Sequence, residues 1–432
     1  MKASLAFTAL FGVQSLAFPA ALVSGDLPAE ELVKITSLAE RISVQAQKRQ
    51  LGLDLVDVGF NAKAQKPDLS GDHAYKAPGP NDIRGPCPGL NVLANHGFIS
   101  RTGVDSAVTI TLASNEVFGM GLDLAAFLSV YSAIMAGDLT SVSIGGPPSS
   151  GLLGGLTSDL GLLGKPQGLS KSHNRFEADA SPTRADLYTS GDVDSVNLEI
   201  FKQLADMPLG PNGYDLTVLH PFRGHRFNTS ISTNGYYWAG PFTHFAVNTA
   251  TYLFTYNFFR NHSSEHPDGY LDLETLMSFE GVTRNTKGDF EWKAGRERIP
   301  DNWYRRAIGD DFGLVAFTRF AVDALVHLPY MAVVGGNTGE PNSFTGVNIA
   351  DITGGVFNAE TLLEGNNVMC LAFRVVSTAT PDLLKGLVGN VLLAVKKLTE
   401  VLDPVLEELS CPQLMKYDAS SFDKFPGAQG GI

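Results

Sequence analysis

The segment that says most about this chain reads Arg84-Gly85-Pro86-Cys87-Pro88-Gly89-Leu90-Asn91-Val92-Leu93-Ala94-Asn95-His96-Gly97-Phe98-Ile99-Ser100-Arg101. Cys87 lies between two prolines, and Pro88 suits the first turn of a helix, where its missing N–H is not needed. Leu90 and Leu93 follow with helical spacing, and Gly97 can end the helix. The pattern therefore predicts a helix that begins directly after Cys87.

A cysteine at a helix start faces unpaired backbone N–H groups and the positive end of the helix dipole, which favour the thiolate. The residues alone leave three roles open: a structural cysteine, a nucleophile that uses one of the nine histidines as a base, or the single axial thiolate of a haem iron. A zinc site is disfavoured, because no second Cys or His lies about two to four residues away.

Composition indicates a soluble, acidic protein. The 432 residues are 44% hydrophobic, which is ordinary for a globular core. Lys and Arg number 32 against 45 Asp and Glu, so the net charge is −13. This balance argues against nucleic acid as a partner, because phosphate binding needs clustered basic residues.

The beginning of the chain has the features of a secretory signal. Lys2 is followed by an apolar run and a small-x-small cleavage pattern, so residues 1–17 are expected to be the signal and the protein to be secreted. Residues 18–66 are expected to be a propeptide or lead-in segment, with the pair Lys48-Arg49 as a processing site or an ordinary helix end. No later run is apolar for long enough to predict a membrane anchor. In a secreted chain, the sequons at Asn228 and Asn261 are potential glycosylation sites.

Apolar periodicity predicts helices through most of the remaining chain. Residues 107–135 form one unusually apolar helical pattern, and an amphipathic helical pattern ends near Leu409. A second motif spans Ser172–Asp186, where Glu177, Asp179 and Ser181 cluster hard oxygen ligands that suit Mg²⁺ or Ca²⁺. A capped helix start explains the same residues equally well.

Residues 81–91 together with Ala94–Gly97 resemble the signature of the fungal haem-thiolate peroxidases, the family of chloroperoxidase and the unspecific, or aromatic, peroxygenases. The resemblance implies a mostly α, single helical haem-peroxygenase-like (chloroperoxidase-like) domain, here placed at residues 67–420. It also implies that Cys87 is the axial ligand of haem b. Backbone N–H groups at Gly89 and Leu90 would then hydrogen-bond the sulfur.

The resemblance extends to the second motif and to the cysteines. The family holds a Mg²⁺ with residues that correspond to Glu177, the carbonyl of Ala178, and Ser181. Its longer members carry a C-terminal disulfide at a similar interval, which supports a bond between Cys370 and Cys411.

The resemblance also implies an enzyme that uses H₂O₂ to oxidise or oxygenate an apolar or aromatic molecule, or a halide. Met120, Phe176 and Tyr252 would then line the substrate pocket.

The predicted acid–base machinery departs from the family. Peroxide cleavage needs a group that moves a proton between the two peroxide oxygens, and the family uses a glutamate. Alignment places Thr249 at that position, and the nearest titratable residue is His244. Asn248 or Thr249 could instead position a water molecule. The alternatives are a haem-binding protein with impaired or altered peroxide chemistry, or a haem-free cysteine hydrolase.

Overall fold

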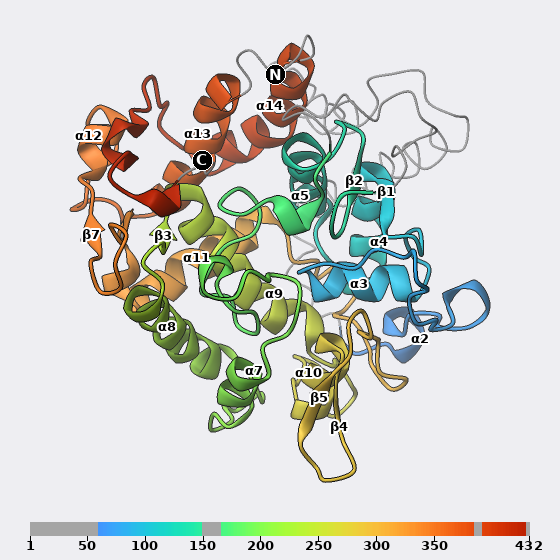
Figure 1. The fold of residues 1–432 in the computed structure, drawn as a ribbon. Helices are drawn as coiled ribbons and strands as arrows, with labels where there is room; N and C mark the ends of the chain where they lie inside the picture. Colours follow the sequence, from blue (N-terminus) through green and yellow to red (C-terminus); the bar gives the residue numbers. More distant parts are fainter. Residues whose placement is uncertain (1–58, 149–165, 384–390, 429–432) are drawn as a thin grey trace, which may run out of the picture.

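The computed structural model describes residues 59–148, 166–383 and 391–428 (Figure 1). The predicted signal, the pair Lys48-Arg49 and the lead-in segment up to residue 58 lie outside the described residues. Within the described part, no helix is long and apolar enough to cross a membrane.

Helices are the main regular structure of the described chain and cover nearly half of it, and the strands are short. The helices are α2 Ala62–Gln65, α3 Pro88–Asn95, α4 Ala107–Phe118, α5 Leu122–Met135, α6 Leu187–Ser190, α7 Leu198–Ala205, α8 Leu216–Thr233, the π-helix η6 Thr243–Asn248, α9 Thr249–Phe259, α10 Leu273–Glu280, α11 Leu314–His327, α12 Ile349–Thr353, α13 Asn367–Leu383 and α14 Val391–Glu408. Short 3₁₀ turns, η4 Gly71–His73, η5 Leu169–Lys171, η7 Pro329–Met331, η8 Ala419–Phe422 and η9 Pro426–Ala428, join or follow them.

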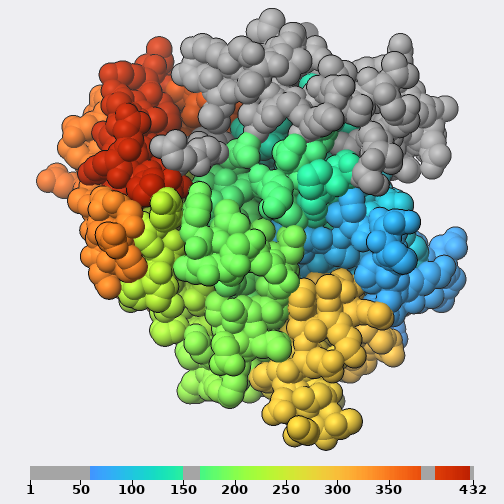
Figure 2. Space-filling view, in the orientation of Figure 1, coloured from blue at the N-terminus to red at the C-terminus, as the bar shows by residue number. Residues whose placement is uncertain are grey.

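The strands form small antiparallel sheets at the edges of the helical body. β1 Val104–Ser106 pairs with β2 Ser141–Ser143, and β4 Val282–Arg284 pairs with β5 Phe290–Trp292. In the third sheet, β6 Gly335–Gly336 lies between β3 Trp238–Ala239 and β7 Thr345–Gly346. The segment containing β4 and β5 projects at the lower edge of the molecule (Figure 2). The mostly α fold class is confirmed.

The apolar pattern over residues 107–135 is two helices rather than one. Gly119 ends α4 in the left-handed region with a φ of 68°, and α5 begins three residues later. A Cβ at Gly119 would lie 2.6 Å from the Arg305 guanidinium, so glycine is also required for space. The two helices pack against each other, and both are largely buried.

The last two helices, α13 and α14, pack against the core of the fold. α14 packs against α5 and α13, and α13 also contacts the π-helix η6 (Figure 1). The predicted disulfide is present: Cys370 on α13 is bonded to Cys411, which follows α14. The two cysteines are 41 positions apart, so the bond ties the beginning of α13 to the end of α14 and closes a loop that contains both helices.

Candidate functional site

Cys87 occupies the position directly before α3, where it is the N-cap residue, and Pro88 is the first helical residue, as predicted. The Asn91 side chain fixes the loop that leads into this helix. Its Oδ1 accepts from the N–H of Gly85 at 3.0 Å, and its Nδ2 donates to the carbonyl of Gly85 at 2.9 Å and to Oε1 of Glu297 at 2.8 Å. One buried amide therefore fixes the loop that carries Cys87.

Other residues of the same motif tie α3 to the rest of the chain. Nε of Arg84 donates to Oδ1 of Asn95 at 2.9 Å, and the Asn95 Nδ2 donates to the carbonyl of Glu297 at 2.7 Å. Nε2 of His96 accepts from the N–H of Ile299 at 3.2 Å. The polar residues of the motif are thus scaffold for the cysteine.

Gly85 is needed because the chain passes very close to a neighbouring strand end. A Cβ at this position would lie 2.1 Å from the carbonyl oxygen of Ile144. Only glycine permits this approach, which places the loop of Cys87 against the end of β2.

An internal cavity lies beside Cys87, and two groups of its lining residues face it from different elements. We call Pro86–Leu90 with Arg184 and Glu280 the Cys87 wall. We call the lining residues of η6 and α9 the α9 wall: Ala246, Val247, Ala250, Thr251, Phe254, Thr255, Phe258 and Phe259. Met120 and Phe176 also line the cavity, as the sequence predicted.

Opposing effects act on the Cys87 thiol. Burial is the largest effect and raises its pKa, because a charged sulfur is poorly solvated inside the protein. The backbone N–H of Leu90, the positive charge of Arg184 and the N–H of Gly89 lower the pKa. The interaction of Gly89 and Leu90 with the sulfur agrees with the expectation from the sequence. A positive charge added beside the sulfur would complete its conversion to thiolate.

Arg184 is the cation of the Cys87 wall. Its Nη1 forms an ion pair with Oε2 of Glu280 and donates to Oγ1 of Thr183 at 2.6 Å. Its Nε and Nη2 are buried and have no hydrogen-bond partner. Buried guanidinium N–H groups are normally paired, so these two are available to an anionic group in the cavity.

Glu297 is a second buried carboxyl group behind the Cys87 wall. Burial raises its pKa to about 7, against the opposing effects of Arg184 and Asn91. Its Oε2 has no hydrogen-bond partner, whereas Oε1 accepts from Asn91. The carboxyl group that accepts from the Asn91 amide therefore keeps its proton to near neutral pH, where an ordinary glutamate is fully ionised.

The α9 wall is apolar, and its hydroxyl groups bond to their own helix. Oγ1 of Thr251 donates to the carbonyl of Asn248 at 2.7 Å, and Oγ1 of Thr255 donates to the carbonyl of Thr251 at 2.9 Å. Among the described lining residues the carboxylates are Glu177 and Glu280, and neither belongs to α9.

Three predicted residues lie away from the cavity: His244 and Thr249, which were predicted for acid–base work, and Tyr252, which was predicted to line the pocket. Nε2 of His244 lies 2.8 Å from the carbonyl of Met331, and burial lowers its pKa to about 3. Oγ1 of Thr249 donates to the carbonyl of His244 at 3.3 Å, and Tyr252 donates to the carbonyl of Ala180 at 2.7 Å. None of the three is among the described residues that line the cavity.

A π-helix that the sequence pattern did not predict directly precedes α9. One π turn over Thr243–Asn248 rotates the following residues relative to a regular α-helix. Asn248 then binds the carbonyls of Asp179 and Ala180 at 3.0 and 3.1 Å, and Thr251 faces the cavity. The period of 3.6 residues that the sequence suggests does not hold here.

The second motif forms a loop along the cavity. Glu177, Ala178 and Ser181 all line the cavity, so the structure brings together the residues predicted to bind Mg²⁺. Nδ1 of His173, however, lies 2.6 Å from Oε2 of Glu177. Burial alone would lower the pKa of His173, but the hydrogen bond to Glu177 and the charges of Asp179 and Glu177 raise it to about 9.

These residues have the donor types of a Mg²⁺ site, but their arrangement does not fit the ion. His173 forms an ion pair with the Glu177 carboxylate, and the Ser181 hydroxyl accepts from the N–H of Arg184 at 3.1 Å. The structure thus shows a loop closed by its own hydrogen bonds. The capped helix start expected at Ser181 is not seen, because α6 begins after Asp186 and the Asp186 side chain makes no cap hydrogen bond.

Sequence reasoning did not identify four residues that organise this site: Asn91, His173, Arg184 and Glu297. Asn91 and Arg184 lie inside the two motifs, so their position was a usable signal. Glu297 is far from both motifs in sequence and reaches Asn91 only through the fold. Of the sequon residues, Asn228 is exposed on α8, and Oδ1 of Asn261 accepts from the N–H of Tyr304 at 2.9 Å.

Comparison with known proteins finds peroxidases and peroxygenases. Residues 73–308 match the family described as peroxidase, family 2. The chain is 42% identical to the dothistromin biosynthesis peroxidase of Dothistroma septosporum, over 93% of this chain and 94% of that one. It is 40% identical to an aromatic peroxidase of Fusarium equiseti, over 96% and 95% of the two chains. It is 30% identical to an aromatic peroxygenase of Cyclocybe aegerita, over 69% and 72%.

Proposed function

This chain belongs to peroxidase family 2, the fungal haem-thiolate peroxidases and peroxygenases, and we propose that it is a secreted enzyme that uses H₂O₂ to oxidise or oxygenate an apolar aromatic molecule. The family establishes an oxidoreductase that acts on peroxide. The observation that carries the rest of the proposal is the partly buried Cys87 thiol at an apolar, aromatic-lined cavity.

The cavity fits the haem that the family implies. Cys87 offers a sulfur ligand, and the unpaired Nε and Nη2 of Arg184 offer donors to an anionic group such as a propionate. Apolar residues supply most of the remaining lining, as a flat apolar macrocycle requires. When bound through a thiolate, haem iron supplies O–O bond cleavage and oxidising power.

The residues of the Cys87 wall hold the sulfur in position and tune its charge. The N–H groups of Leu90 and Gly89 and the charge of Arg184 favour the thiolate. The double hydrogen bond between Asn91 and Gly85 keeps the loop from moving when the sulfur is engaged. Glu280 neutralises part of the Arg184 charge and so limits the fall in the pKa of the thiol.

The α9 wall and the facing phenylalanines provide a binding surface for an apolar substrate. Phe127, Phe242 and Phe317 line the cavity in addition to Phe176. Aromatic side chains favour aromatic ligands through edge and offset-stacked contacts. The names of the aromatic peroxidase and the aromatic peroxygenase support the same class of substrate. Oxidation of a halide is a further reaction open to this family.

One specific observation favours a second candidate function, a haem-binding protein with impaired or altered peroxide chemistry. The two carboxylates among the described lining residues are each bound by a cation, Glu177 by His173 and Glu280 by Arg184. The α9 wall offers hydroxyl groups in place of a carboxylate. Proton transfer between the peroxide oxygens would then rely on water held by such groups, and the rate would be low.

Secretion is part of the proposal. The signal-like pattern of residues 1–17 and the two sequons support it, and a disulfide is typical of proteins that fold in an oxidising compartment.

The experiment uses full-length protein secreted by a haem-supplied host, H₂¹⁸O₂ and three reporters: naphthalene, a substituted phenol and bromide. The expected result is a haem-dependent naphthalene product that carries ¹⁸O from the peroxide. Haem-loaded protein that converts none of the reporters would instead support the second candidate. Conversion of phenol alone would identify a peroxidase without oxygen transfer.

A further inference from the structure

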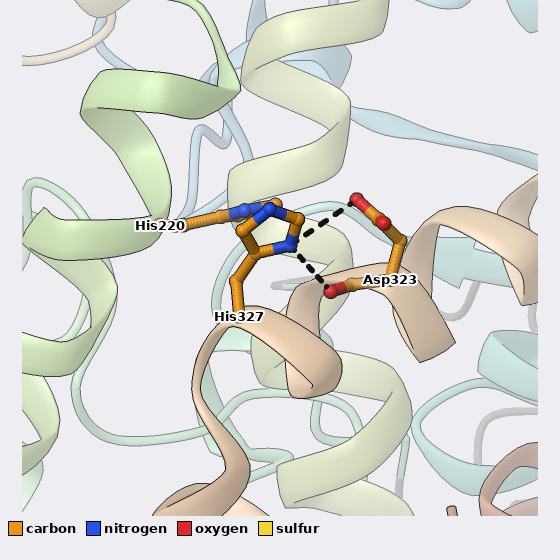
Figure 3. A group of neighbouring side chains, drawn as sticks. All are labelled: His220, Asp323 and His327. Carbon is orange, nitrogen blue, oxygen red and sulfur yellow. Dashed lines mark hydrogen bonds and ion pairs between the residues drawn. The ribbon is translucent and has the colours of Figure 1, made fainter.

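A second cluster of ligating side chains lies away from the Cys87 cavity. His220 on α8 faces Asp323 and His327 on α11, and one ligand atom from each residue lies within 4.8 Å of the other two (Figure 3). Asp323 and His327 are one helical turn apart and share one face of α11. None of the three is among the described residues that line the cavity.

His220 provides the main indication that something binds here. Its side chain is buried, with 4% of its surface exposed, and its Nε2 has no hydrogen-bond partner. Buried polar atoms are normally satisfied, so an unpaired imidazole nitrogen on a residue that lies beside two further ligating groups requires an explanation. A metal ion would supply the missing partner, because neutral imidazole is a strong ligand of d-block cations.

His327 is oriented as a metal-binding imidazole would be. Its Nδ1 lies 2.9 Å from the backbone carbonyl of Asp323, and Figure 3 shows its ring beside the ring of His220, with centroids 5.4 Å apart. Donation from Nδ1 to a carbonyl fixes the tautomer and leaves the Nε2 lone pair free for a metal. Asp323 and His327 are exposed, so both can move the small distance needed to complete the coordination.

We propose that His220, Asp323 and His327 form a zinc site with an open fourth position for water. Two imidazoles and one carboxylate are a ligand set that zinc accepts with tetrahedral geometry, whereas Mg²⁺ and Ca²⁺ prefer oxygen ligands alone. The ion would link α8 to α11, and both helices pack against α9. The site therefore cross-links the two helices that support the α9 wall.

The competing explanation is a simple surface contact. Nδ1 of His327 lies 3.6 Å from Oδ2 of Asp323, a distance consistent with an ordinary ion pair near the end of a helix. That contact would exist without a metal, and it would leave Nε2 of His220 unpaired. The two explanations differ in whether zinc binds and in whether its binding depends on all three residues.

The test is a zinc titration of untagged, chelator-treated full-length protein against a chromophoric zinc chelator, with millimolar Mg²⁺ present to occupy oxygen-donor sites. One tight site per chain is expected. The exposed-residue variant His327→Ala should weaken zinc binding more than about 100-fold, since even residues that only support a ligand contribute about 10–100-fold. Asp323→Asn should weaken binding about tenfold or more. His225→Ala, an exposed histidine on the same helix α8, is the matched control and should bind zinc normally.

A second measurement covers the buried ligand, where a variant could disturb folding. Zinc should raise the melting temperature of the native protein and of His225→Ala but not of His327→Ala, because only folded protein holds the complete ligand set. Zinc-edge X-ray absorption should show two imidazoles in the native protein and one in His220→Gln. Absence of a tight site, or equal zinc affinity and equal stabilisation in His327→Ala and the native protein, would overturn the proposal.

Discussion

The Cys87 wall and the α9 wall face the same cavity and are built in opposite ways. The Cys87 wall depends on buried polar groups: Asn91 bonds to Gly85 and Glu297, and Arg184 pairs with Glu280. The α9 wall is apolar, and its hydroxyl groups are satisfied by the backbone of its own helix. One wall is therefore fixed by specific hydrogen bonds, and the other is shaped by packing and by a π turn.

The difference shows which part of the site is specialised for holding the sulfur. A thiolate needs a fixed position and a tuned charge, and a network of directional bonds supplies both. An apolar substrate needs only a surface of suitable shape, so the α9 wall can vary without loss of the sulfur site. Four changes can break or sharpen this comparison.

The largest effect is expected from a carboxylate added to the α9 wall. Thr251→Glu places a general acid–base group at the cavity and should raise peroxide-dependent turnover about 10²- to 10⁴-fold, or up to about 5 kcal/mol of barrier. Thr249→Glu, the position chosen by sequence alignment, is the matched control, because Thr249 is not a lining residue. Turnover measured at fixed haem loading distinguishes them. If turnover rose in Thr249→Glu alone, Thr249 rather than Thr251 would face the cavity, and the account of α9 would be wrong.

Removal of the disulfide should loosen the side of the cavity formed by α13. Phe373 on α13 lines the cavity, and the bond from Cys370 closes a loop of 41 residues. The double variant Cys370→Ala/Cys411→Ala should lose about 4 kcal/mol of unfolding free energy, the chain-entropy value for a loop of this length. Chemical denaturation measures the loss. A reducing agent should destabilise the native protein but not the variant, and equal sensitivity of the two would contradict the account.

Asn91→Leu tests the polar network of the Cys87 wall. It removes the partners of the Gly85 N–H and carbonyl and of Glu297, and should cost about 3 kcal/mol of unfolding free energy along with haem affinity. Asn257→Leu is the matched control on α9, since that buried side chain has one local bond, to the carbonyl of Leu253. It should cost only about 1 kcal/mol. Equal losses in the two variants would show that the network has no special role.

The smallest effect concerns the pH dependence that Glu297 confers. Its pKa is about 7 in the folded protein against a usual 4.5, so the folded state keeps a proton that the unfolded state has already lost. Stability from this group is therefore present below about pH 4.5 and is lost as the pH rises through 7, by about 2–3 kcal/mol.

Glu297→Gln keeps the shape of the side chain and the acceptor for Asn91 but cannot titrate. Unfolding free energies measured from pH 4.5 to 8 should therefore show a smaller decline with rising pH in this variant than in the native protein. Parallel pH profiles would mean that Glu297 does not titrate in this range.

The comparison also explains what the sequence could predict. Local patterns predict the position of Cys87 directly before α3 and the presence of many helices, because helix capping and apolar periodicity depend on neighbouring residues. The family resemblance is confirmed for the same reason, since its motifs are continuous in the sequence. The disulfide is also confirmed.

Other features could not be predicted because they depend on contacts that are distant in sequence or on irregular backbone. Glu297 meets Asn91 across 206 residues, and nothing near Glu297 marks it as buried. The π turn before α9 is an irregular backbone feature that the sequence pattern did not show. Thr249, which was expected at the cavity, does not line it, whereas Thr251 does. His173 pairs with Glu177 within one motif, but only the folded loop shows which partner the carboxylate takes.

The most direct test of the central claim is an optical spectrum of the full-length, haem-supplied protein, reduced under carbon monoxide, beside the same spectrum of Cys87→Ala. The account predicts a strongly red-shifted Soret band of the thiolate type that is lost in Cys87→Ala. A protein without haem, or a thiolate-type band that persists in Cys87→Ala, would contradict the assignment of Cys87 as the iron ligand.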